Sequence, residues 1–203
     1  MKIALIGASG RVGSRLLAEL LRRGHAVAGI ARDKTQLPSR PGLVLETGDA
    51  TRPAQLAPLL AGHDVVASAT RFQSSDPQAL IAAVKQAGVP RLMVVGGAAT
   101  LEVAPGRMLL DAPDFPEAYK PEALAGRRFL DALRMEKDLD WTFLSPSAEF
   151  APGERTGKFR VGGDRLLRDT SGKSRISMED YAIAFVDELE APKHPRQRFT
   201  VGY

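Results

Sequence analysis

The feature that most constrains the fold of this chain is a glycine-rich segment near its start. The apolar run Ile3 to Ile6 leads directly into three glycines spaced by three, and leucines at helical spacing follow from Leu16. This order predicts a strand, a tight turn and a helix, with the first amide groups of the helix unpaired at the positive end of its dipole. An anion binds at such a place, most often the pyrophosphate of a dinucleotide. The residues expected to hold it are Gly7, Ala8, Ser9, Gly10, Arg11, Val12 and Gly13. A tight turn without a ligand is the alternative.

Apolar and amphipathic runs alternate after this segment. We expect strands at 3–6, 26–31, 43–46, 64–69, 91–95 and 140–144, and helices at 14–23, 53–60, 77–87 and 121–137. This rhythm predicts an α/β, Rossmann-like doubly wound parallel sheet in a single domain, residues 1–203. The part from about 146 to 203 is expected to form a small C-terminal extension on the substrate side and not another βα unit. It should contain a short strand at 156–161, a helix near 174–189 capped by Ser177, and a last strand at 198–203.

The end of the second strand bears on the choice of cofactor. In dinucleotide-binding folds this place faces the adenosine ribose, where an arginine accommodates a 2′-phosphate. Arg32 stands there, so the sequence favours NADP(H) over NAD(H), with NADH still possible. The alternative is a surface arginine paired with Asp33.

The carboxyl ends of the first, fourth and fifth strands should meet along one crevice, because right-handed crossovers place ligands there. Small residues at these ends would leave room for a nicotinamide ring: Ala69, Thr70, Gly96 and Gly97. The proline-rich stretch 101–119 is expected to be irregular and to form part of a wall over the substrate.

Composition excludes several other functions. The chain has no cysteine, so it has no disulfide, thiolate nucleophile or zinc–sulfur site. His25, His63 and His194 are scattered on expected turns, and we expect them to be solvent-exposed and to bind no metal. The net charge of +4 is spread among acidic residues, which argues against nucleic acid and for a basic pocket. Without a signal peptide or membrane span, we expect a cytoplasmic protein, a monomer or homodimer.

The spacing of Gly7, Gly10 and Gly13 resembles that of the short-chain dehydrogenase/reductase superfamily, particularly its extended and atypical branches. In that superfamily an aspartate after the third strand binds the adenine edge, which Asp49, followed by Ala50, would match. The alternative is that Asp49 or Thr51 caps the next helix. The superfamily's tyrosine with a lysine four residues later is absent, because Ala123 stands four residues after Tyr119.

Later segments narrow the resemblance. They are Gly96-Gly-Ala98, Leu101-Glu-Val-Ala-Pro-Gly106, Trp141-Thr-Phe-Leu-Ser-Pro146, Glu154-Arg-Thr-Gly157, Ser174-Arg-Ile-Ser177 and Arg198-Phe-Thr-Val-Gly-Tyr203. Together with the glycine loop, they resemble the bacterial NADH-flavin reductases, atypical short-chain proteins similar to the biliverdin IXβ/flavin reductases. The resemblance covers almost the whole chain. It implies an NAD(P)H-dependent reductase that transfers hydride from NADPH to a free flavin or a similar planar aromatic acceptor, with the flavin as substrate and not as a bound prosthetic group.

Such a reaction needs little acid catalysis, because a flavin takes hydride at one ring nitrogen and the second proton can come from water. Thr100 stands where this family more commonly carries serine, and Ser145 and Ser147 flank Pro146, a candidate cofactor contact. We expect the three hydroxyls to contact nicotinamide or substrate; satisfied loop hydroxyls are the alternative. Ser147 replaces a histidine of the biliverdin reductase branch, so that residue's role does not transfer. A non-catalytic NADP(H)-binding redox sensor, as among NmrA-like proteins, is the competing function, and a sugar-nucleotide epimerase is third.

Overall fold

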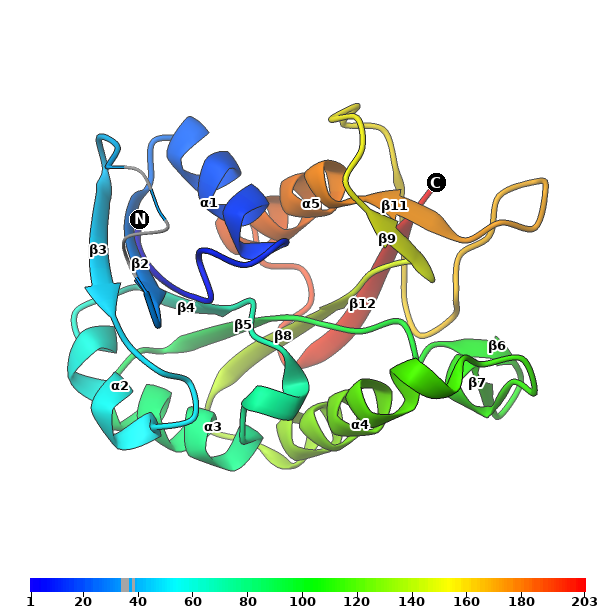
Figure 1. Cartoon of the computed structure of the whole chain (residues 1–203), viewed down its shortest axis with the longest axis horizontal. Coiled ribbons are helices and arrows are strands. Elements are labelled where there is room, and N and C mark those ends of the chain that lie inside the picture. Colours follow the sequence, from blue (N-terminus) through cyan, green and yellow to red (C-terminus); the bar gives the residue numbers. More distant parts are fainter. Residues whose placement is uncertain (34–36, 38) are drawn as a thin grey trace.

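The central sheet is built outward from the buried first strand. The computed structural model describes residues 1–33, 37 and 39–203. β1 (Lys2–Ile6) pairs in parallel with β2 (Ala26–Ala31) and with β4 (Val65–Ser68). The strand order is β10-β12-β8-β5-β4-β1-β2-β3 (Figure 1). The other strands are β3 (Leu43–Thr47), β5 (Arg91–Val95), β8 (Asp140–Ser145), β10 (Arg160–Gly162) and β12 (Gln197–Gly202). Only the β10–β12 pairing in this sheet is antiparallel among the described residues, which confirms the Rossmann-like α/β fold in one domain.

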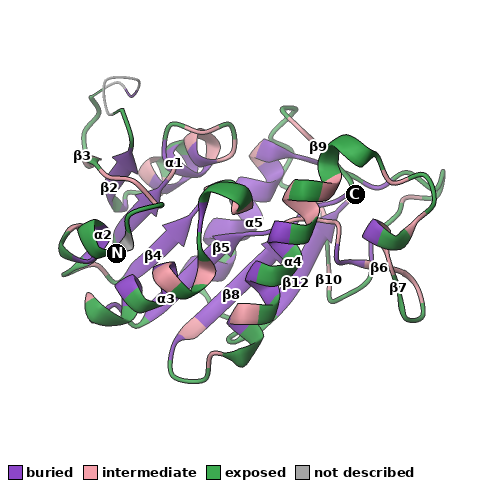
Figure 2. Cartoon of the chain, turned by 60° about the horizontal axis from the view of Figure 1, so that its bottom comes forward, coloured by how far each residue is buried: buried purple, intermediate pink, exposed green. Residues whose placement is uncertain are grey.

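Helices cover both faces of this sheet. α1 (Gly13–Arg22) and α5 (Met178–Glu190) lie on one face, and α2 (Pro53–Leu60), α3 (Pro77–Gln86) and α4 (Lys120–Met135) lie on the other (Figure 1). Figure 2 shows the strands largely buried and α4 carrying both buried and exposed residues. The helix is amphipathic, since Phe129, Leu130 and Leu133 are buried whereas Arg127 and Arg128 are exposed.

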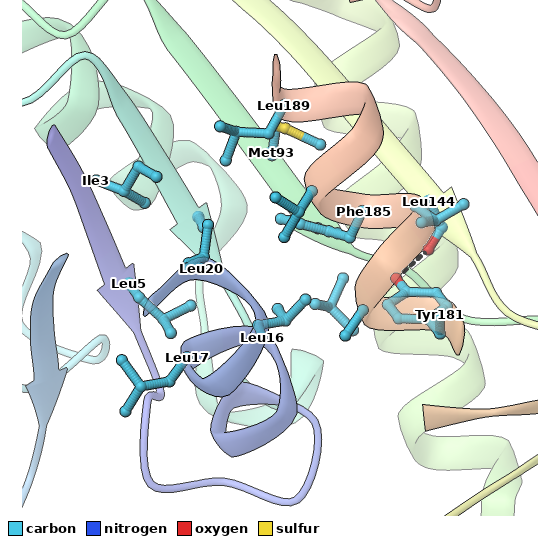
Figure 3. Packing of buried hydrophobic residues seen from close by; sticks show 14 of the residues in the cluster. Ile3, Leu5, Leu16, Leu17, Leu20, Met93, Leu144, Tyr181, Phe185 and Leu189 are labelled. Atoms are coloured by element: carbon cyan, nitrogen blue, oxygen red, sulfur yellow. Dashed lines mark hydrogen bonds between the residues drawn. The ribbon is translucent and has the colours of Figure 1, made fainter. Parts of the chain in front are cut away.

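Side chains of β1 alternate between the two halves of the core. Ile3 and Leu5 pack into a cluster under α1 and α5, whereas Ala4 and Ile6 face the cluster under α2 and α3. Figure 3 shows the first cluster, where the Tyr181 hydroxyl donates a hydrogen bond of 2.6 Å to the Leu144 carbonyl. Burial raises the pKa of the Tyr181 hydroxyl, so this group stays protonated and has a structural role.

Glu19 of α1 has the strongest electrostatic contacts of this layer. Its side chain is 4% exposed and accepts hydrogen bonds from Arg22, Arg23 and Arg155. Burial alone would raise the pKa of this carboxyl, but the hydrogen bonds from the three guanidinium groups outweigh burial and lower it to about 2. The ionised carboxylate therefore links α1 to the loop that precedes β10.

The structure corrects the interpretation of the C-terminal part. β12 pairs in parallel with β8, and α5 packs beside α1, so this region does contain another crossover unit. Ser177 caps α5 as expected, accepting a hydrogen bond of 3.0 Å from the Asp180 amide. However, β11 (Arg175–Ser177) is a strand that pairs with β9 (Glu149–Ala151), and neither was expected. Each of the two strands has three residues, which is too short for an alternation of apolar and polar side chains to predict a strand.

The stretch 101–119 is more regular than expected. It contains a small antiparallel ribbon of β6 (Glu102–Ala104) and β7 (Arg107–Met108), followed by 3₁₀ turns at Leu109–Asp111 and Glu117–Tyr119. Gly106 has a φ of +68° and closes the ribbon. Within the described part of the chain, no helix has the length and apolar character needed to cross a bilayer.

Candidate functional site

The turn after β1 is held close to its neighbours by two glycines. Gly7 has a φ of +81°, and its amide donates a hydrogen bond of 2.8 Å to the Ile30 carbonyl at the end of β2. A Cβ at Gly7 would lie 2.8 Å from the Ala69 carbonyl oxygen, and one at Gly13 would lie 2.0 Å from the Gly7 oxygen. The conformation and the close approach of α1 to the turn therefore both require glycine.

The start of α1 offers unpaired donors beside this turn. Among the described residues, no acceptor bonds the amide groups of Arg11, Val12 or Gly13, whereas the Ser14 amide already bonds to Gly10. α1 begins at Gly13 without a side-chain cap. The strand, turn and helix predicted from the sequence are thus confirmed, and the open donors form a cradle suited to an anion.

A groove of about 800 Å³ opens in front of this cradle, at the carboxyl ends of β1, β2, β4 and β5. Most of the predicted cofactor residues line it: Gly7, Ser9, Gly10, Arg11, Val12, Arg32, Asp49, Ala50, Ala69, Thr70 and Gly96. Ala8, Gly13 and Pro146 are buried and do not line it. Gly97 lines a neighbouring pocket instead.

The groove carries more positive than negative charge. Arg11, Arg32 and Arg71 line it together with Asp49 and Glu122. The first two arginines were predicted, whereas Arg71 was not. Three guanidinium groups beside open helix amides match the phosphates of a dinucleotide, so the residues present fit NADP(H) as a cofactor.

Asp49 has a different local role from the capping alternative. Its carboxylate accepts a hydrogen bond of 2.9 Å from the Thr51 amide, and hydrogen bonds from Thr51 lower its pKa, with smaller contributions from the charges of Arg32 and Arg52. The residue at the N-cap of α2 is Arg52, which makes no side-chain cap. The alternative in which Asp49 or Thr51 caps α2 is therefore wrong. Asp49 is held ionised at the groove, where its contact with adenine stays a prediction.

A smaller pocket of about 240 Å³ adjoins the groove, and we call it the acceptor pocket. Phe72, Tyr119 and Glu122 border both cavities. The other lining residues of the acceptor pocket are Gly97, Ala98, Ala99, Thr100, Leu109, Phe115, Ala123, Gly126, Phe143 and Ala148. The stretch 101–119 thus forms one wall of this pocket, through Leu109, Phe115 and Tyr119.

Phe72 lies at the junction of the groove and the acceptor pocket. Its ring centroid lies 5.9 Å from that of Phe143 and 5.4 Å from that of Phe129. A Cβ at Gly126 would approach the Phe72 ring to 2.9 Å, so the glycine of α4 makes room for the ring. Glu122 fixes the loop by accepting hydrogen bonds from the amides of Phe72 (2.7 Å) and Gln73 (3.2 Å).

The three predicted hydroxyls lie in different surroundings. Thr100 is 6% exposed and lines the acceptor pocket, with Nη1 of Arg198 3.4 Å from its Oγ1. The Ser147 hydroxyl is buried and donates to the Val201 carbonyl at 2.9 Å. The Ser145 hydroxyl is buried without a partner among the described residues. Neither serine lines the groove or the pocket. The structure thus brings only Thr100 to the pocket, and contacts of Ser145 and Ser147 with a ligand stay predictions.

Among the described residues, no lysine takes the place of the partner that Tyr119 lacks in sequence. Tyr119 is 66% exposed at the junction of the two cavities, and the Lys120 ammonium pairs with Glu117. Glu122, Phe72 and Arg198 were missed by sequence reasoning, because each acts through contacts with residues far away in the chain.

The expectation of three solvent-exposed histidines is wrong for His25. It is 8% exposed, and its Nε2 lies 2.8 Å from a carboxylate oxygen of Glu190 at the end of α5. His194 stacks on Phe199 with ring centroids 4.1 Å apart. His63 is half-buried beside the Leu60 carbonyl. Over the described residues, no group of histidines and acids is arranged to hold a metal ion.

Comparisons with known proteins agree with this geometry. Residues 7–192 match the NAD(P)H-binding family. The uncharacterized protein YwnB of Bacillus subtilis is 39% identical over 99% of this chain and 98% of its own. A Bacteroides thetaiotaomicron protein proposed to be an epimerase superposes with a TM-score of 0.95 at 42% identity, over 100% of this chain and 96% of its own. A Streptococcus pneumoniae protein proposed to be an NADH-flavin reductase has a TM-score of 0.84 at 34% identity, over 100% of this chain and 99% of its own.

Proposed function

Because this chain belongs to the NAD(P)H-binding family and has an oxidoreductase-like fold, we propose that it transfers hydride from NADPH to a free flavin or a similar planar aromatic acceptor. The observation that carries the proposal is the direct contact between a phosphate-binding groove and an acceptor pocket lined by aromatic side chains. Phe72, Tyr119 and Glu122 belong to both, so two ligands bound there would touch.

Different residues of the groove would bind different parts of NADPH. The open amides of Arg11 and Val12 would bind the pyrophosphate, and Arg32 would bind the 2′-phosphate. When bound, NADPH supplies the hydride. Gly96 lines the groove at the end of β5, and a Cβ there would lie 2.4 Å from the Phe143 ring, so the packing of β5 against β8 requires glycine at this position.

The acceptor pocket orients the second ring system. Phe72, Phe115 and Phe143 line the pocket with aromatic side chains, and Gly97 to Thr100 line it beside them. Orientation of two stacked rings can supply most of the rate acceleration, which explains how the reaction proceeds without a tyrosine–lysine pair. Thr100 is the buried hydroxyl at the pocket, and the second proton comes from water.

A direct assay tests the proposed function. Purified protein is mixed with NADPH and riboflavin, FMN or a quinone, and loss of the reduced nicotinamide absorbance is followed. We expect turnover with at least one acceptor. The variant Gly13→Val should abolish NADPH binding and turnover together, since its side chain would occupy the Gly7 oxygen position. Protein that binds NADPH but oxidises it with none of these acceptors would contradict the proposal.

A non-catalytic NADP(H) sensor is the second candidate. It is favoured by the pairing of Lys120 with Glu117, which leaves Tyr119 without a lysine partner for proton transfer in the described part of the chain. A sensor should bind NADP⁺ and NADPH with different affinities and retain a partner protein in one of the two states. Equal affinities, together with steady turnover of an acceptor, would remove this candidate. The same missing pair argues against epimerase chemistry.

A further inference from the structure

We propose that the acceptor is an uncharged quinone of one or two fused rings, and not a phosphorylated flavin. This inference rests on the proposed function, because it names the substrate class of the same site. Three properties of the acceptor pocket support it. They are its small volume, the absence of lysine and arginine from its described lining residues, and the Thr100 hydroxyl, which accepts a hydrogen bond from Arg198.

The size of the acceptor pocket limits the ligand. Its volume of about 240 Å³ lies below the range of about 300–1,000 Å³ that is typical for drug-sized ligands. A flavin has three fused rings and a polyhydroxylated chain, so only part of it would enter. The pocket cannot simply widen toward α4, because the Phe72 ring already contacts Gly126 and is held by Phe129 and Phe143.

The charge of the pocket opposes a phosphate group. No lysine or arginine is among its described lining residues, and its one carboxylate belongs to Glu122. That carboxylate accepts hydrogen bonds from the Phe72 and Gln73 amides and lies 3.9 Å from Nε of Arg71, which lines the groove and not the pocket. A phosphate placed here would lose its hydration beside the Glu122 carboxylate, and no ammonium or guanidinium among the described lining residues would contact it, since Arg198 behind Thr100 is paired with Asp164. The arginines lie in the groove, where NADPH would need them.

Thr100 is placed to bind a carbonyl oxygen. Its Oγ1 lies 3.4 Å from Nη1 of Arg198, and Nη2 of Arg198 lies 3.5 Å from its backbone oxygen. Since Arg198 can only donate, the Thr100 hydroxyl accepts from it and keeps its own hydrogen for another acceptor. Asp164 pairs with Arg198 and holds this guanidinium in place. A quinone oxygen directed at Thr100 would receive that hydrogen bond.

The reaction balances without further reagents. The C–H bond of the reduced nicotinamide breaks, and the quinone gains the hydride with its two electrons. One proton from water adds to the second oxygen. The quinone is reduced to the hydroquinone, and NADPH is oxidised to NADP⁺.

The test compares three acceptors at saturating NADPH: menadione, which is a two-ring naphthoquinone, riboflavin and FMN. We expect kcat/KM for menadione to exceed that for either flavin by about tenfold or more. Equal or better turnover of riboflavin would overturn the size limit, and equal or better turnover of FMN would overturn the charge argument; either result rejects the proposal. NADPH that binds but is oxidised by no acceptor would instead reject the proposed function.

A pair of matched variants on α4 locates the quinone. Ala123 lines the acceptor pocket, whereas Ala132 lies on the same helix in the open groove between α3 and α4, and both are half-buried. Ala123→Leu should lower kcat/KM for menadione by about tenfold without changing the Kd of NADPH. Ala132→Leu should change neither. Thermal unfolding of both variants shows that they fold. Unchanged menadione turnover in folded Ala123→Leu would overturn the assignment of the pocket.

Discussion

Removing the guanidinium of Arg32 tests the cofactor assignment most sharply. Arg32 is exposed at the end of β2 and lines the groove beside Asp49. NADPH and NADH differ only in the 2′-phosphate that this residue is proposed to bind. Arg32→Ala should therefore weaken NADPH binding and leave NADH binding nearly unchanged.

The size of the effect follows from the surroundings of Arg32. A hydrogen bond between charged groups contributes about 1.5–3 kcal/mol. Two features reduce this value: Arg32 is exposed to solvent, and its charge already acts on the Asp49 carboxylate, whose pKa it helps to lower. Arg11 also remains in the groove. The lower part of the range, about 1.5–2 kcal/mol, corresponds to a Kd about 10- to 30-fold higher for NADPH.

Titration of nicotinamide fluorescence measures both affinities in wild type and Arg32→Ala, at two salt concentrations. The loss for NADPH should shrink at high salt, because exposed charges are screened. Arg128→Ala is the matched control, since Arg128 is an exposed arginine of α4 outside the groove. Equal losses for NADPH and NADH, or no loss for either, would refute the placement of the 2′-phosphate at Arg32.

Three further predictions concern other parts of the fold. The folded-state pKa of Glu19 is about 2, below its ordinary value of 4.5. The ionised carboxylate therefore stabilises the fold at neutral pH, and this contribution is lost as the pH falls from 4.5 toward 2. The pKa shift limits the contribution of Glu19 to the free energy of unfolding to about 3 kcal/mol. Solvent screening of the partly exposed arginines reduces the loss expected for Glu19→Gln to about 1–2 kcal/mol. A loss, measured by urea unfolding, that stays constant from pH 7 to about pH 2 would contradict the assignment. Tyr181→Phe should lower stability by about 1 kcal/mol without altering NADPH affinity, because it removes the hydrogen bond to the Leu144 carbonyl and keeps the ring; a shifted Kd would show that this hydroxyl acts on the site. Thr100→Val should lower kcat/KM for the acceptor by about fivefold or more at constant NADPH affinity; an unchanged kcat/KM would show that this hydroxyl does not bind the acceptor.

Local patterns were sufficient to predict β1 to β5 and β8 of the sheet, but not the parallel pairing of β12 with β8. The limits of β2 (Ala26–Ala31), β5 (Arg91–Val95) and α2 (Pro53–Leu60) agree with expectation, because each is a continuous apolar or proline-initiated run. The turn from Gly7 to Gly13 was equally readable, since the residues that need glycine and the helix that follows are adjacent in sequence. The cofactor groove is largely assembled from such segments, and most of its lining was therefore predicted.

The amino-acid sequence by itself thus determined the βα order, the anion cradle and the positions of Arg11 and Arg32, because these depend on neighbours within one turn or one strand. Only the tertiary structure decided the acceptor pocket, whose main contacts join residues about 50 or 100 positions apart, as between Phe72 and Glu122 or between Thr100 and Arg198. It also decided that β12 joins β8 and that α5 covers His25. The physical reason is that the burial and the hydrogen bonds of these residues arise only when separate layers of the fold pack together. The local hydrophobic periodicity does not predict which layers pack against one another.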